Sequence, residues 1–271
     1  MSRIHDTFIE LKRSGRGGFI PFITAGDPDL VTTELLLVEL AAAGADIIEV
    51  GVPFSDPVAD GEIIQRASER ALRKRVTLSD TLKCISHVKQ HTDVPIVLFS
   101  YFNPLLKFGK DRLADEAKQA GVDGVLITDL IPEEALAWTR AFREHRLDPI
   151  FLVAPTTSDE RLRHIAQQAS GFIYAVSRSG VTGTRNEMPP DAESLVNRAR
   201  KVSDLPVAVG FGISTAEQVG QVWRFADAAV IGSAIVGQIE RLSADVDLVE
   251  RVGRFARSLL TAKPLRQKAI S

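Results

Sequence analysis

Glu49 and Asp60 are the two residues whose types and positions point most directly to chemistry. Glu49 lies inside the apolar run ADIIEV (45–50), near the carboxyl end of an expected strand. Because alternate residues of a strand face opposite sides, Glu49 shares a face with Ile47. Burial of a carboxyl group on such a face raises its pKa, which suits a general acid and base. From position alone, a buried ion pair or a carboxylate that caps the strand end explains Glu49 equally well.

The loop that follows Glu49 brings a second carboxylate. GVPFSDPVADG (51–61) has too many glycine, proline and aspartate residues for a strand or helix, so we expect a loop at the carboxyl end of the strand. Asp60 is then a candidate to face the same cavity as Glu49, and two carboxylates in different environments can take different roles. An ordinary Asp-Gly turn that caps a helix over 62–73 is the alternative for Asp60, and Asp56 is as ambiguous.

Three glycine-rich loops indicate a phosphorylated ligand. GFGIS (210–214) follows one expected strand, and GSAIV (232–236) follows the next and opens a helix that Ser233 is placed to cap. Backbone N–H groups at glycine turns and helix N-termini bind anions, and barrels often hold phosphate after strands seven and eight. SRSGVTGT (177–184) could close over the site as a lid. Tight turns alone would also explain glycines, but three such loops after consecutive strands favour a phosphate site.

These loops need a scaffold, and eight short apolar runs supply one. The runs read as buried parallel strands because they are nearly continuous in Val, Ile and Phe. They span 18–23, 45–50, 95–99, 124–128, 149–153, 171–176, 206–210 and 228–232. Eight β/α units without a break in composition favour a closed (β/α)₈ barrel (TIM barrel) over an open doubly wound sheet. We expect a single domain over 1–271 with a short extra N-terminal helix, and about 263–271 as a candidate disordered tail.

The helices between the runs are expected from their periodicity and end signals. Over 29–43, Val31 and Leu35 follow helical spacing and define an apolar face, and a helix over 159–169 is opened by Ser158 or Asp159. A helix over 132–144 is expected to begin with proline in its first turn.

The composition excludes several classes of function. Hydrophobic residues make up 45% and charged residues 25% of the 271, and the net charge is −2. Without a cluster of Lys and Arg among aromatic residues we expect no nucleic-acid binding, and without an apolar run of about 18 residues we expect no membrane span. The single cysteine, Cys84, and an N-terminus without an apolar core are typical of a cytoplasmic protein.

No metal or nucleotide site is expected either. The five histidines fall on expected helices or their ends and lack a metal-binding spacing such as HExxH. The turn after the first strand reads TAGDPD, which is a poor dinucleotide fingerprint. Tyr174, on the opposite strand face from Ala175, and Phe22, near the end of the first strand, can each line a cavity or fill the barrel core.

Several of these segments together resemble the tryptophan synthase alpha family. The run EVGVPFSDPVADG followed by IIQRAS closely matches the signature of that family. The segments PFITAGDP, SRSGVTGTR, GFGIS and IGSAIV match as well, in order, over roughly residues 5–240. The resemblance implies a lyase that cleaves indole-3-glycerol phosphate to indole and glyceraldehyde 3-phosphate.

The resemblance also implies residue roles. Glu49 would be the acid and base at the indole ring carbon and the glycerol hydroxyl, and Asp60 would hold the indole N–H and stabilise positive charge. Thr182 matches the residue that meets Asp60 on loop closure. The positions that match the family's phosphate site are Gly183, Gly212, Gly232 and Ser233, and those that match its substrate pocket are Phe22, Tyr174 and Phe211.

A partner is implied in the same way. Family members dock on a beta subunit that holds pyridoxal phosphate and receives indole through a tunnel, in a heterotetramer of two alpha and two beta chains. The matching loop positions are Pro53, Asp56, Asn103 and Arg178. This chain itself would hold no cofactor. Glu62 departs from the family, which often has proline there, and adds a third acid to the loop.

Two other functions are compatible with parts of the sequence. Another phosphate-binding barrel enzyme of biosynthesis, such as an isomerase, would share the glycine loops but not the pairing of Glu49 with PFSDPVADG. A non-catalytic activator of the beta subunit would need the interface loops but not the two acids. The presence of both acids and all three glycine loops favours the lyase.

Overall fold

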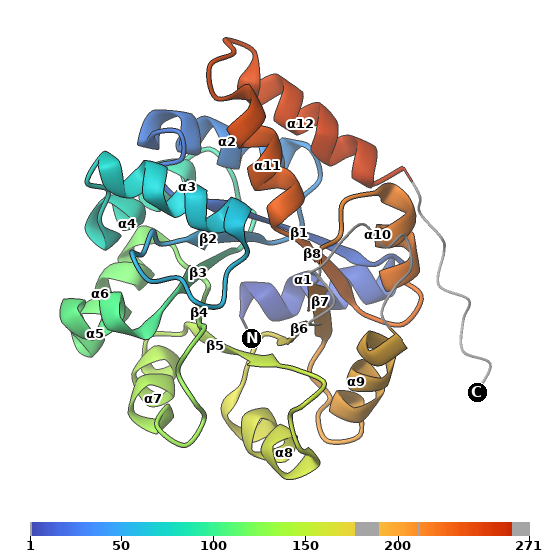
Figure 1. Cartoon of the computed structure of the whole chain (residues 1–271). Coiled ribbons are helices and arrows are strands. Elements are labelled where there is room, and N and C mark those ends of the chain that lie inside the picture. The colour runs from blue at the N-terminus through green and yellow to red at the C-terminus, as the bar shows by residue number, and fades with distance from the viewer. Residues whose placement is uncertain (1, 177–189, 211, 262–271) are drawn as a thin grey trace.

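A closed barrel of parallel strands forms the centre of the molecule (Figure 1). The computed structural model describes residues 2–176, 190–210 and 212–261. Within them, eight strands pair in chain order, and the eighth pairs with the first to close the barrel. The strands are β1 (Gly18–Thr24), β2 (Ile48–Gly51), β3 (Ile96–Ser100), β4 (Gly124–Ile127), β5 (Asp148–Val153), β6 (Ile173–Val176), β7 (Val207–Gly210) and β8 (Ala228–Ile231). The expected (β/α)₈ barrel is confirmed, and each strand lies where an apolar run predicted it.

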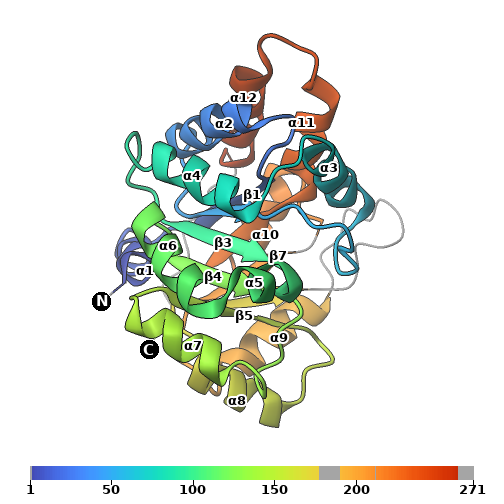
Figure 2. The same ribbon diagram turned by 90° about the vertical axis from the view of Figure 1, so that its left-hand side faces the viewer.

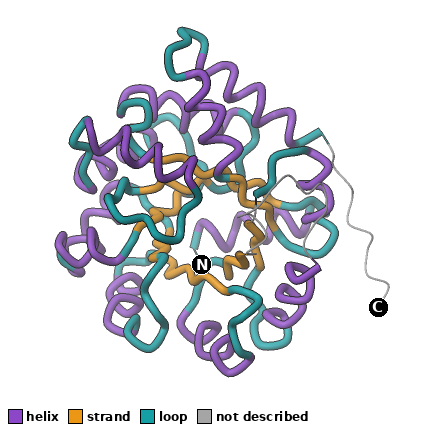
Figure 3. Tube along the Cα trace, viewed as in Figure 1, coloured by secondary structure: helices purple, strands orange, loops and turns teal. Residues whose placement is uncertain are grey.

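Helices other than α1 surround the strands as an outer ring (Figure 3). The helices are α1 (Arg3–Arg13), α2 (Leu30–Ala42), α3 (Glu62–Arg73), α4 (Leu78–Val88), α5 (Phe102–Phe108), α6 (Lys110–Ala120), α7 (Leu136–Glu144), α8 (Asp159–Gln168), α9 (Pro190–Arg200), α10 (Ala216–Val222), α11 (Ser233–Leu242) and α12 (Leu248–Leu259). No helix among the described residues is both long and apolar enough to cross a bilayer.

The extra helix α1 covers the amino-terminal end of the barrel, opposite the loops that carry the candidate site (Figure 2). Its buried residues Ile4, Phe8 and Leu11 join the cluster of side chains that fills the barrel interior. The strand residues of that cluster are Ile20, Ile47, Val97, Leu126, Ile150, Phe172, Ala208, Ala228 and Val230. Because the lower interior is filled by these apolar side chains, a ligand has room only at the other end, where the β/α loops emerge.

Two expectations about helices were wrong in detail. Val31 and Leu35 of α2 are exposed, and the buried face is formed by Leu36, Leu37 and Leu40 with Thr33. The three leucines bury more apolar surface against the barrel, so the helix is rotated and the other apolar residues face outward. Helix α8 begins where expected, with the Ser158 side chain accepting from the Arg161 N–H.

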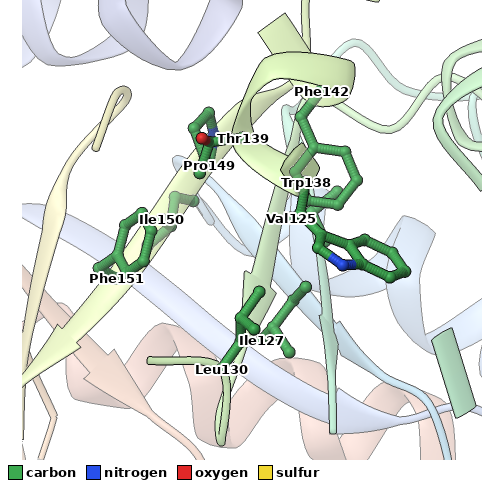
Figure 4. Close-up of a pocket in the computed structure, with 9 residues that line it drawn as sticks. All are labelled: Val125, Ile127, Leu130, Trp138, Thr139, Phe142, Pro149, Ile150 and Phe151. Carbon is green, nitrogen blue, oxygen red and sulfur yellow. The ribbon is translucent and has the colours of Figure 1, made fainter. Parts of the chain in front are cut away.

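Helix α7 begins at Leu136, whereas the sequence predicted that it begins at Pro132, four residues earlier. Trp138 and Phe142 anchor it over β4 and β5, as Figure 4 shows. The cavity beneath them measures about 10 Å³ and is lined by apolar side chains. That volume fits at most one water-sized sphere, so the cavity is a gap in core packing and not a ligand site.

Candidate active site

Glu49 is fully buried in the barrel, toward the end where the β/α loops emerge. It lies on β2 between Phe22 of β1 and Val97 of β3 in the strand register. Its exposed fraction is 1%, and neither carboxylate oxygen finds a hydrogen-bond partner among the described residues. Burial raises the pKa of Glu49 to about 8, because the charged form is not solvated there. Within the part of the chain that the structure describes, Glu49 makes neither an ion pair nor a capping hydrogen bond, so these contacts support neither structural alternative.

Asp60 lies at the end of the loop that follows β2. Helix α3 begins at Glu62 with Gly61 as its N-cap, and no side chain makes the cap hydrogen bond. The capping explanation for Asp60 is therefore wrong. Asp60 is half-buried, and burial raises its pKa to about 6, while a hydrogen bond from Tyr101 acts in the opposite direction. The chain thus places two carboxyl groups with different pKa values at one end of the barrel.

Tyr101 is a site residue that the sequence analysis missed. Its hydroxyl donates to the Asp60 carboxylate and accepts from the Ala59 N–H at 3.0 Å. Its ring packs on Phe54 of the same loop, with ring centroids 5.2 Å apart. Tyr101 follows β3 directly, so a polar aromatic residue just past the carboxyl end of a strand was the signal available in the sequence. Tyr101 holds the Asp60 loop at three points.

Replacement of Tyr101 by phenylalanine should raise the pKa of Asp60 further. The substitution removes the hydrogen bond that favours the ionised carboxylate, and leaves the Ala59 N–H without its acceptor. We expect the unfolding free energy to fall by about 1 kcal/mol. Titration of the Asp60 carboxyl carbon by NMR measures the shift, and an unchanged or lower pKa in Tyr101→Phe would contradict the assigned hydrogen bond.

Aromatic side chains surround the two carboxyl groups. Phe22 is buried and meets Phe99 edge-on, with ring centroids 5.2 Å apart. Tyr174 points into the barrel, and the pKa of its hydroxyl is raised well above the ordinary value by burial and then by the charges of Glu49 and Asp60. Both acids therefore act electrostatically on the Tyr174 hydroxyl.

Gly210 makes room for this arrangement. It pairs with Val176 in the β6–β7 register, one strand away from Tyr174. A Cβ atom at Gly210 would lie 2.4 Å from the Tyr174 hydroxyl, closer than any real contact. The glycine at the end of β7 therefore keeps the space between Tyr174 and the neighbouring strand open.

The turn from β8 into α11 has the features of an anion site. Gly232 is the N-cap of α11 and Ser233 is its first residue, and the first intrahelical donor is the Val236 N–H, which bonds to the Gly232 carbonyl. The backbone N–H groups that precede Val236 have no acceptor within the helix. They form the positive end of the helix dipole. The Ser233 side chain makes no cap hydrogen bond, so the expected capping role was wrong. A Cβ at Gly232 would lie 3.7 Å from Phe22, which ties this turn to the barrel mouth.

Of the other predicted site residues, some lie in the described part of the chain and some outside it. Gly212 has a φ of +33° and open space where a Cβ would point. Pro53 is buried, whereas Asp56 and Asn103 are exposed on the β2–α3 loop and on α5. Four predicted residues lie outside the described part of the chain, namely Arg178, Thr182, Gly183 and Phe211.

A cavity of about 360 Å³ opens at the same end of the barrel. It lies between the loops that follow β4 and β5, and its lining is half polar in character. Its lining residues are Ile127, Thr128, Asp129, Leu130, Ile131, Pro132, Phe151, Leu152, Thr156, Thr157, Ser158, Arg161 and Ile165.

Comparison with known proteins finds one matching family model and close relatives over nearly the whole chain. The family model described as tryptophan synthase alpha chain matches residues 8–262. The tryptophan synthase alpha chain of Geobacter sulfurreducens is 50% identical over 262 residues, with 97% of this chain and 99% of that one covered. That of Citrifermentans bemidjiense is 49% identical over 259 residues, with 96% and 97% covered.

Solved structures agree in fold. A tryptophan synthase subunit alpha from Legionella pneumophila superposes with a TM-score of 0.90 at 38% identity, with 97% of this chain and 98% of that one covered. A chain described with the tryptophan synthase complex of two alpha and two beta chains from Pyrococcus furiosus gives 0.86 at 39% identity, with 90% and 98% covered.

Proposed function

Because the chain belongs to the tryptophan synthase alpha chain family and is a lyase of tryptophan biosynthesis, we propose that Glu49 and Asp60 together cleave its substrate, indole-3-glycerol phosphate. The observation that carries the proposal is the buried carboxyl of Glu49, which has no hydrogen-bond partner among the described residues, at the same end of the barrel as the half-buried Asp60. The full chain incubated with indole-3-glycerol phosphate should release indole and glyceraldehyde 3-phosphate in equal amounts. Absence of both products would contradict the proposal.

Glu49 is suited to two successive proton transfers, in which it donates one proton and then accepts another. Cleavage of the carbon–carbon bond requires a proton on the ring carbon that bears the glycerol chain, and removal of the proton from the adjacent chain hydroxyl. With a pKa near 8, Glu49 is protonated at neutral pH and can donate to the ring carbon. The carboxylate that results then accepts the hydroxyl proton as the bond breaks, so Glu49 ends in its starting state.

Asp60 is suited to remain charged. With a pKa near 6 and the Tyr101 hydroxyl donating to it, Asp60 is ionised at neutral pH. A fixed negative charge at the indole N–H stabilises the cationic ring that protonation creates, and preorganised charge of this kind is often the largest catalytic contribution. This acid–base route requires neither an imine-forming lysine nor a metal, so we propose that the chain works without a cofactor.

The rate of cleavage should therefore follow a bell-shaped pH profile. Activity rises as Asp60 loses its proton near pH 6, and falls as Glu49 loses its proton near pH 8. The maximum lies between the two values, because only there is Asp60 ionised while Glu49 is protonated. Measurement of kcat/KM for indole-3-glycerol phosphate from pH 5 to 10 checks this, and a rate that keeps rising above pH 9 would oppose the role of Glu49 as the acid.

The phosphate of the substrate is proposed to bind at Gly232 and Ser233, with Gly212 and Gly183 of the neighbouring loops, while Phe22, Tyr174 and Phe211 line the pocket for the rest of the substrate. Substitution Ser233→Asp should raise KM by at least about tenfold, because a carboxylate would face the phosphate where backbone amides now do. The matched control Ser233→Ala keeps the amide and should bind nearly normally. Equal KM values for the two variants would count against the assignment.

A beta subunit that holds pyridoxal phosphate is the proposed partner, in an assembly of two alpha and two beta chains. Large apolar side chains are exposed on the segments that follow β2, β3 and β4, namely Val58 and Ile131 in loops, Leu106 in α5 and Leu136 at the start of α7. Exposed apolar groups of this size suit a protein interface. Asp56 lies in the same loop as Val58 and Asn103 in the same helix as Leu106, and Pro53 and Arg178 complete the proposed contact. A cytoplasmic location is proposed from the family to which the chain belongs.

Turnover measured with and without the beta subunit tests the partner. We expect faster release of indole when the beta subunit is present, because the β2–α3 loop that carries Asp60 also carries the exposed Val58. The same rate with and without a beta subunit, or no complex on gel filtration, would show a lyase that acts alone.

A further inference from the structure

An unbroken series of ion pairs joins three elements of the fold behind the site. Arg70 of α3 donates from Nε and one terminal nitrogen to both oxygens of Asp27, at 2.7 and 2.8 Å. Its other terminal nitrogen donates to Glu240 of α11 at 2.7 Å. Arg66 of α3 binds both oxygens of Glu240, at 2.7 and 2.8 Å. The series therefore links the β1–α2 turn to α3 and α3 to α11.

The Arg70–Asp27 contact is not an ordinary surface ion pair, whereas the Arg66 and Glu240 side chains are 46% and 27% exposed. Asp27 is 1% exposed and the Arg70 side chain 24% exposed, and the guanidinium group of Arg70 is shared between two carboxylates. Exposed pairs contribute little to stability, whereas two parallel hydrogen bonds to a buried carboxylate fix both distance and orientation. Hydrogen bonds from Arg66 and Arg70 hold the pKa of Glu240 down to about 2, so Glu240 stays charged at every working pH.

The two helices that this series joins each begin at or within two residues of a candidate site residue. Helix α3 begins two residues after Asp60, and α11 begins at Ser233 of the proposed phosphate turn. Their facing side chains Ala67 and Val236 pack in one cluster with Phe22, and Ile63 lies within 3.7 Å of where a Cβ at Gly237 would be. The separation of Asp60 from the phosphate turn is therefore set by how α3 lies on α11.

We propose that Arg70 and Glu240 are positioning residues for the lyase reaction, and that the tie they form between α3 and α11 fixes the distance from Asp60 to the phosphate turn at Gly232 and Ser233. Arg70 binds α3 to the buried Asp27, and Glu240 binds α11 to the same arginine. Neither residue contacts the substrate. This inference rests on the proposed function, since it concerns the two ends of one phosphorylated substrate.

The substrate must bind both ends of this span at once. Its phosphate lies at α11 while its indole N–H meets Asp60, so slack between the helices misplaces one end relative to the other. Reactive geometry is sensitive to displacements of about 1 Å, which can reduce a rate by about a hundredfold. A ligand that has only the phosphate end is insensitive to the same slack. Turnover and phosphate binding should therefore respond differently when the tie is cut.

Glu240→Leu is the decisive variant, because it cuts both arginines from α11 and leaves the buried Arg70–Asp27 pair intact. Leucine also keeps the helical propensity of α11. We expect kcat for indole-3-glycerol phosphate to fall by about tenfold or more, with KM and the inhibition constant of glycerol 3-phosphate changed by less than about threefold. Glu240→Gln, which can still accept from an arginine, should recover part of kcat.

Arg257→Met is the matched control. Arg257 of α12 donates to Glu39 of α2 at 2.8 Å, so it also ties two outer helices, but neither helix begins at a site residue. Its removal should leave kcat within about twofold of the wild type. A merely structural role for Glu240 would give the two variants similar kcat values when they are assayed well below their unfolding temperatures.

A second measurement separates the positioning role from a general loss of order. If the tie acts through Asp60, Glu240→Leu should reduce kcat far less in an Asp60→Asn background than in the wild type. Equal reductions in both backgrounds, or a wild-type kcat in Glu240→Leu, would overturn the inference while the lyase activity of the wild type stands. Failure of the wild type to cleave the substrate would instead overturn the proposed function.

Discussion

Glu49→Gln is expected to release no detectable indole while it still folds and binds substrate. Glutamine is nearly isosteric with glutamate, but it can neither donate a proton to the ring carbon nor accept one from the glycerol hydroxyl. Because the same group serves both proton transfers, its loss stops the cleavage altogether and does not merely slow one step. Indole release followed over hours, with substrate binding measured by calorimetry, provides the check. Retained lyase activity would contradict the mechanism, and lost binding would make the variant uninformative about proton transfer.

The same substitution should stabilise the fold, and increasingly so with pH. The wild-type Glu49 has a folded pKa near 8 against 4.5 when unfolded, so above pH 4.5 the unfolded chain releases a proton that the folded chain keeps. Wild-type stability is therefore lost between pH 4.5 and pH 8, at about 1.4 kcal/mol per pH unit. Glu49→Gln lacks this loss. Urea unfolding at pH 4.5, 6 and 8 should show that the unfolding free energy of the variant, relative to that of the wild type, increases with pH. If this difference were the same at all three pH values, Glu49 would be ionised in the folded state.

Asp60→Asn is expected to lower kcat by about 10²–10³, the cost of removing one preorganised group that stabilises charge in the transition state. Asparagine keeps the size of the side chain and can accept from Tyr101, but it has no negative charge to place at the indole N–H. The loss should fall on kcat more than on KM, because the ring becomes cationic only during the reaction. Steady-state kinetics with indole-3-glycerol phosphate provides the measurement.

Glu62→Gln is the control for Asp60→Asn. Glu62 lies two residues after Asp60 in the chain, and its side chain is 92% exposed. The substitution Glu62→Gln therefore removes one negative charge close to Asp60 from a side chain that faces solvent. Its kcat should stay within about twofold of the wild type, since exposed charges are well screened. Equal losses in the two variants would mean that the net charge of the loop matters and that Asp60 has no specific role.

The sequence predicted the barrel well because its main signals are local. Eight apolar runs and the turn residues between them are each readable over a few residues, and their order determines the closed sheet. Glu49 was placed on the interior face by alternation alone, and Ile47, on the same face, does pack in the barrel interior. Its lack of a hydrogen-bond partner was not readable, because partners come from strands that are distant in sequence.

The features that the sequence did not reveal depend on long-range contacts. Tyr101 and Asp60 are 41 positions apart in the chain, and only the closed barrel brings the hydroxyl to the carboxylate. The tie from Asp27 through Arg70 to Glu240 spans most of the chain, and none of these three residues looks unusual in its local segment. The buried face of α2 was mispredicted for a related reason, since two apolar faces were available and only packing chose between them.

Titration of the Glu49 carboxyl in the wild-type protein tests the central claim most directly. Carboxyl carbons can be followed by NMR, with Glu49→Gln identifying the Glu49 signal by its disappearance. A midpoint near pH 8, with Glu49 protonated at neutral pH beside an ionised Asp60, is the result that this mechanism predicts. A midpoint near the ordinary value of 4.5 would show Glu49 charged at neutral pH, and it could not then donate the proton that starts the cleavage.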